Sequence, residues 1–229
     1  MTKLAPVSRV RAWASFGAVG LAIALDVLLF KLYWRGLLDS TVVSALRITN
    51  GVGAMAAVAI LLRLSRVNMG LRLESDIPWR LVFKWGWRAA AAFVGIFLMS
   101  VWVTAWTRGT CSLYPLVRPV HPEVIASAAL LAPLVEEPLY RGALCPAAHS
   151  VLGRRGGIVA CGVVFGGLHV VYGNPGIDNL TAGFLFGWLF YWSRSLLIPS
   201  LVHGVGNGLL FGLLYLVRRF YDLDAMCGG

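Results

Sequence analysis

The sequence has few charged residues for its length. Only 13% of its 229 residues are Asp, Glu, Lys or Arg, whereas a soluble domain usually carries about 25%. Mean hydropathy is +0.76, and the apolar residues lie in long blocks rather than in short alternating runs. Because a helix that spans a bilayer needs about 20 mostly apolar residues, the composition argues against an ordinary soluble domain and predicts an integral membrane protein.

Linkers, repeats and cysteine motifs are also lacking. No Pro-rich, Ser-rich or Gly-rich stretch divides the chain, so we expect a single integral membrane domain over residues 1–229. The cysteines show neither a CxxC motif nor metal-binding spacing. A reduced cysteine in an apolar block behaves as a small hydrophobe, and we expect no disulfide framework. The four cysteines are Cys111, Cys145, Cys161 and Cys227.

Acidic residues are outnumbered by basic ones, 10 against 20, which gives a net charge of +10. The Lys and Arg residues lie mainly between the apolar blocks, where they set topology and meet anionic headgroups. We therefore expect membrane lipids, and not nucleic acid, as their partners. If every block spans, twelve basic residues fall on the side of the N-terminus and six on the other. This asymmetry predicts a multi-pass protein of the cell membrane with a cytoplasmic N-terminus.

Seven apolar blocks are visible along the chain. They predict an all-α, polytopic membrane bundle of about seven to eight transmembrane helices. The blocks run roughly from Trp13 to Trp34, Val42 to Leu62, Ala89 to Trp106, Val124 to Ala148, Ile158 to Tyr172, Leu180 to Trp192 and Leu196 to Val217.

The fourth block contains two adjacent glutamates, Glu136 and Glu137, followed by Pro138 and Arg141. Ionisable groups inside a membrane are costly, so each is a functional hypothesis. Glu137 and Arg141 are four residues apart and are expected to pair on one helix face. Glu136 points about 100° away and is left free for proton transfer, while Pro138 loosens the helix. The structural alternative is a buried ion pair that joins two helices.

Later blocks add histidines. Phe165 and His169 are four residues apart in the fifth block, and His203 and Asn207 are four apart in the seventh. Each pair shares a helix face, and the second pair offers two hydrogen-bond donors. A single intramembrane histidine is more often a core residue than a catalyst, but three helices that each carry costly polar groups favour a site.

Asp26 and Arg47 are charges that lie deeper in the first and second apolar blocks. At 1.5 Å per residue they lie at similar depths on consecutive antiparallel helices. This placement predicts an ion pair, which would offset part of the burial cost.

The ordered motifs resemble the CPBP family, the intramembrane proteases named for CAAX-processing enzymes and bacteriocin-processing proteins. Their signature is Glu-Glu-x-x-x-Arg, then Phe-x-x-x-His, then His-x-x-x-Asn or Asp. The resemblance places the protease core in residues 122–217 and implies glutamic-type hydrolysis of membrane-associated protein or peptide substrates, with C-terminal sorting tags as one candidate. It implies catalytic roles for Glu136, His169, His203 and Asn207, and supporting roles for Glu137, Arg141 and Phe165.

These roles agree with general chemistry. Glu136 would act as general base on a water that His169 helps to position. His203 and Asn207 would stabilise the oxyanion. No cofactor is expected. There is no HExxH motif, although His169, His203 and a glutamate offer an alternative zinc site.

Two other classes remain open. Cys145 lies one turn after Arg141, which suits a cysteine-type sorting peptidase. A non-catalytic scaffold or transporter would use the polar groups to hold helices together or to carry protons. The sequence does not indicate the oligomeric state.

Overall fold

The computed structural model describes residues 8–66, 68–71, 77–109 and 121–220, and all the regular elements it describes are helices. The predicted all-α class is confirmed. Cys111 and Cys227 lie outside the described residues.

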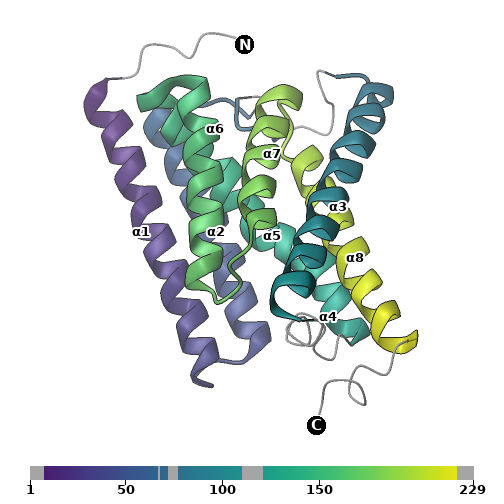
Figure 1. Ribbon diagram of the computed structural model, residues 1–229. Coiled ribbons are helices and arrows are strands. Elements are labelled where there is room, and N and C mark those ends of the chain that lie inside the picture. The colour runs from purple at the N-terminus through teal and green to yellow at the C-terminus, as the bar shows by residue number, and fades with distance from the viewer. Residues whose placement is uncertain (1–7, 67, 72–76, 110–120, 221–229) are drawn as a thin grey trace.

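The first two helices are long and antiparallel (Figure 1). α1 covers Arg9–Trp34 and α2 covers Ser40–Leu62. Each begins at a polar N-cap: the Ser8 side chain accepts from a backbone N–H of α1, and the Asp39 carboxylate accepts from two of α2. Such caps satisfy donors that the first helical turn leaves free. α3 follows at Trp79–Arg108.

The next 50 residues form one irregular helical segment. It contains two π-helical stretches, in which each N–H bonds one residue further back than in an α-helix. Pro138, which has no N–H to donate, begins the second stretch. The parts are α4 (Pro122–Ala126), η2 (Ser127–Leu131), α5 (Ala132–Glu137), η3 (Pro138–Leu144) and α6 (Cys145–Val171).

A sharp bend divides α6. Gly153 has φ 72° and ψ 179°, a conformation that glycine adopts more readily than other residues. Counted on either side of this bend, and with α7 (Ile177–Ser193) and α8 (Leu197–Phe220), the described chain has seven helices. This number agrees with the predicted seven to eight.

The bundle places α5 near its centre, with α1, α2 and α6 on one side and α3 and α8 on the other (Figure 1). Four helical segments of the described chain are long and apolar enough to cross a membrane. Large apolar side chains face outward all along the bundle; Leu21, Ile60 and Trp106 are each 76% exposed. An exposed apolar surface of this extent suits lipid and not water. The protein is therefore a membrane protein, as predicted.

Candidate active site

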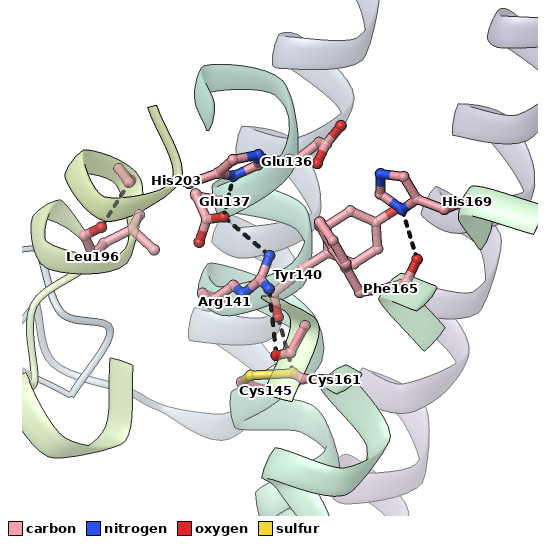
Figure 2. A network of polar contacts seen from close by, with 12 residues as sticks. Glu136, Glu137, Tyr140, Arg141, Cys145, Cys161, Phe165, His169, Leu196 and His203 are labelled. Carbon is pink, nitrogen blue, oxygen red and sulfur yellow. Dashed lines mark hydrogen bonds and ion pairs between the residues drawn. A yellow bond between two sulfur atoms is a disulfide. The ribbon is translucent and has the colours of Figure 1, made fainter. Parts of the chain in front are cut away.

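Glu137 is the centre of a buried polar network. Its Oε1 accepts a hydrogen bond from Arg141 Nη1 at 3.0 Å and lies 2.8 Å from His203 Nδ1 (Figure 2). The Glu137 and Arg141 side chains are completely buried. The predicted pairing of Glu137 with Arg141 is confirmed, and it places compensating charges next to each other in an environment where either one alone would be costly.

Aromatic rings enclose this network. The Arg141 guanidinium lies 4.5 Å from the ring centroid of Phe165 and 5.0 Å from that of Phe186, distances at which a cation is attracted to a ring face. Phe186 also stacks on His203, with centroids 4.9 Å apart. Nothing in the sequence singles out Phe186, because it lies in a continuous apolar block. Its contacts fix the positions of Arg141 and His203.

Glu136 is the carboxylate that the network leaves free. Its nearest ionic partner is His203 Nε2, 3.8 Å from Oε2, which is too long for a hydrogen bond. Oε2 is buried and has no hydrogen-bond partner among the described residues, while the whole side chain remains 13% exposed. Two neighbouring carboxylates thus have different environments: Glu137 is paired, and Glu136 is available to a water or a substrate.

His169 is fixed by its own helix. Its Nδ1 lies 2.8 Å from the carbonyl oxygen of Phe165. A carbonyl oxygen only accepts, so Nδ1 must carry the proton, and Nε2 of the neutral ring is an acceptor. The Phe165 ring lies 4.5 Å from the His169 ring and 6.1 Å from the His203 ring, measured between centroids. Phe165 therefore joins the two histidines, which accounts for its place among the predicted supporting residues.

The two predicted oxyanion donors bond to different partners. Asn207 Nδ2 donates to the carbonyl oxygen of Ala128 at 2.9 Å, and His203 Nδ1 faces Glu137. A Cβ at Gly204 would lie 2.5 Å from the carbonyl oxygen of Ala129, so only glycine lets α8 approach η2 this closely. One N–H of the Asn207 amide and Nε2 of His203 are not used in these bonds.

The predicted ion pair between Asp26 and Arg47 is confirmed. Arg47 Nε and Nη2 donate to the two Asp26 oxygens at 2.8 and 2.9 Å. The Tyr172 hydroxyl donates to Asp26 Oδ2 at 2.5 Å. Tyr172 was not singled out in the sequence.

The cysteines correct one expectation. Cys145 and Cys161 are joined by a disulfide bond (Figure 2), although the sequence analysis expected none. The spacing of 16 residues carried no signal, because the bend at Gly153 is what brings the two positions together. Both residues are fully buried, and in this bonded form Cys145 has no thiolate to act as the nucleophile of a cysteine peptidase.

For the alternative zinc site, the described residues include no group of three or more His, Cys, Asp or Glu side chains placed to hold a metal ion.

A membrane helix bundle that holds a free carboxylate beside a neutralised one, with histidines from two further helices, fits the class of intramembrane proteases. The family model described as type II CAAX prenyl endopeptidase, Rce1-like, matches residues 122–209. The match includes every predicted site residue and confirms the family resemblance of this segment. Comparisons with curated proteins and with solved structures found no match.

Proposed function

We propose that the protein is a glutamic-type endopeptidase that cleaves membrane-associated protein or peptide substrates within the bilayer. The observation that carries the proposal is the contrast between Glu137, whose Oε1 bonds to Arg141 and His203, and Glu136, whose Oε2 lies 3.8 Å from His203 and has no hydrogen-bond partner among the described residues. Two neighbouring carboxylates with different hydrogen-bond partners can take different roles in acid–base chemistry.

In the proposed reaction, Glu136 takes a proton from a water as that water attacks the scissile carbonyl. His169 accepts a hydrogen bond from the same water through Nε2, since Nδ1 is committed to Phe165. The proton on Glu136 is then available to the leaving amine. No metal is required by this scheme.

The oxyanion of the tetrahedral intermediate needs donors. His203 supplies one if Nε2 is protonated while Nδ1 bonds to Glu137. The Glu137 and Glu136 carboxylates lie 2.8 Å from Nδ1 and 3.8 Å from Nε2, so the ring lies between them. Asn207 supplies another through the amide N–H that is not bonded to Ala128. Glu137 and Arg141 hold His203 in place for this role.

Among membrane-associated substrates, we propose proteins that carry C-terminal sorting tags as the first class to examine. The purified protein in lipid vesicles is incubated with three sets of membrane peptides (sorting-tagged, prenylated and unmodified), and the products are mapped by mass spectrometry. The Glu136→Gln variant serves as control. We expect cleavage only by the unaltered protein and little inhibition by phenanthroline. Cleavage by Glu136→Gln would end the glutamic mechanism, loss on chelation with recovery by zinc would move the chemistry to a metal, and no cleavage of any peptide would favour a scaffold.

A further inference from the structure

A second buried ion pair adjoins the site from α1 and α2. Asp26 is 1% exposed, and both of its oxygens bind the Arg47 guanidinium. The Tyr172 hydroxyl bonds to the same carboxylate. Tyr172 therefore fixes Asp26, and Asp26 in turn holds Arg47 through two hydrogen bonds. Arg47 itself is 14% exposed, so the cation is less enclosed than the anion that fixes it.

The packing of α2 on α5 brings Arg47 toward Glu136. Arg47 lies four residues before Gly51, on the same face of α2. A Cβ at Gly51 would lie 3.2 Å from the carbonyl oxygen of Val135 and 3.3 Å from the backbone nitrogen of Leu139. The backbones are thus nearly in contact at the turn that carries Glu136, and Arg47 is one helical turn away, about 6 Å along the axis. Arg47 and Glu136 thus lie on adjoining turns of two packed helices, where opposite charges attract each other.

Two aromatic rings complete the setting of Arg47. The guanidinium carbon lies 5.7 Å from the ring centroid of Phe30 and 5.5 Å from that of Tyr172. The Tyr172 ring is also 6.2 Å from the ring of His169. Asp26 occupies Nε and Nη2 of the guanidinium, which leaves Nη1 outside that bidentate contact.

The charges around the site assign different roles to its two arginines. Arg141 neutralises Glu137, and Glu136 has no cation in hydrogen-bond contact among the described residues. The described charged and titratable side chains that hydrogen bonds, ion pairs or ring contacts join around Glu136 and Arg47 are Asp26, Glu137, Tyr140, Arg141, His169, Tyr172 and His203. Of the two arginines in this region, Arg47 is the one that does not bond to Glu137.

We propose that Arg47 is a positioning residue for the reaction proposed above: its positive charge, held in place by Asp26 and Tyr172, stabilises the Glu136 carboxylate in the orientation in which it accepts a proton from water. Asp26 is then the holder of Arg47 and not a catalyst. The simpler alternative is that the pair only ties α1 to α2. A neutral pair of similar shape would serve that purpose equally well, because replacement of a buried ion pair as a whole is often without cost to stability.

Three variants separate these roles. Asp26→Asn keeps the cation, Asp26→Asn with Arg47→Gln removes it without leaving an unpaired aspartate, and Asp26→Asn with Arg47→Lys restores it. Their kinetics are measured in lipid vesicles on a fluorogenic form of a peptide that the unaltered protein cleaves. We expect the Asn/Gln variant to unfold near the temperature of the unaltered protein but to lose kcat on the order of tenfold, with KM changed less than about twofold. The Asn/Lys variant should keep most of kcat. Asp26→Asn keeps the Arg47 charge but loosens its hold and leaves it unpaired, so we expect lower stability and a kcat between those of the unaltered protein and the Asn/Gln variant.

The outcomes are distinct. An Asn/Gln variant that is stable and has unchanged kcat would show that the pair only ties helices. The proposal would also be overturned if kcat and thermal stability fell together in all three variants. The single change Arg47→Lys, which keeps both charges, checks the result in case the Asn variants do not fold, and loss of its kcat with normal stability would also count against the proposal. Because the inference rests on the proposed function, Glu136→Gln is measured in parallel. Full activity in Glu136→Gln would contradict the proposed function itself. An inactive Glu136→Gln variant beside an Asn/Gln variant with unchanged kcat would contradict only the role of Arg47.

Discussion

At the scale of single residues, the adjacent glutamates give the sharpest contrast. Glu136→Gln keeps the size of the side chain but removes its basicity, so we expect activity to fall by about 10²–10⁴-fold with normal thermal stability. Glu137→Gln removes the charge that compensates the fully buried Arg141, so we expect a loss of stability of about 3 kcal/mol. Peptide cleavage and thermal unfolding distinguish the two. Glu123→Gln, on an exposed position of α4, is the matched control and should change neither quantity.

Side-chain pairs that follow from helix spacing were predictable. Glu137 with Arg141 follows from a separation of four residues, and Asp26 with Arg47 follows from equal depth on consecutive helices. Both pairs are present. The rings that position them were not predictable, because an aromatic residue in a membrane span has the same sequence signature whether it faces lipid or a guanidinium.

Phe186 tests whether these rings matter. It is 6% exposed and contacts both Arg141 and His203. Phe186→Ala should cost about 3–5 kcal/mol of stability and lower activity beyond that loss, because His203 is no longer held. Phe186→Leu keeps most of the side-chain volume but removes the ring that stacks on His203, so it separates the effect of core packing from the effect of stacking. Full activity in a folded Phe186→Ala variant would contradict a role in positioning His203.

At the scale of helices, the site depends on how closely backbones approach. A Cβ at Gly51 would lie 3.2–3.4 Å from atoms of Val135, Leu139 and Pro138, whereas nothing lies within 4 Å of a Cβ at Gly53. Gly51→Ala should therefore reduce stability by about 1–3 kcal/mol and displace α2 from the glutamates. Gly53→Ala should be neutral or stabilise by about 0.5–1 kcal/mol, because alanine favours the helix. Equal thermal unfolding temperatures for the two variants would contradict the close packing.

The disulfide is a second constraint between helical segments. It closes a loop of about 15 residues across the bend at Gly153, a length at which a cross-link contributes about 3 kcal/mol. The double change Cys145→Ala with Cys161→Ala should lower the unfolding temperature and remove its sensitivity to reductant, with activity retained at low temperature. Thiol labelling of the denatured, unreduced protein should find two free cysteines. Four free cysteines would contradict the bond.

The helix pattern itself was predictable, and its irregularities were only partly so. Seven apolar blocks correspond to seven helices because lipid requires long apolar runs. Pro138 indicated a loosened helix, but no sequence feature gave the lengths of η2 and η3 or the bend at Gly153. These features arise where packed neighbours stabilise backbone geometry that an isolated helix would avoid.

At the scale of the whole molecule, the remaining question is which face of the bundle meets the cytoplasm. Basic residues near span ends favour the cytoplasmic side. Arg154 and Arg155 follow directly on the bend at Gly153 and are exposed, and the bend lies at the same end of the bundle as the start of α1 (Figure 1). We therefore expect that end of the bundle to be cytoplasmic, because the positive charges of the N-terminal region and of this bend favour the same orientation.

Thiol labelling on intact cells tests this orientation. We expect Cys111 to react with a membrane-impermeant maleimide in a Cys227→Ala background, because it follows the third span and falls on the external side. Cys145 and Cys161 are buried and should stay unlabelled. The matched control places the only accessible thiol at the bend, as Arg154→Cys with Cys111→Ala and Cys227→Ala, and it should react only after lysis. The reverse result, with the bend labelled on intact cells and Cys111 only after lysis, would mean that the N-terminus is external and that the basic residues do not set the topology.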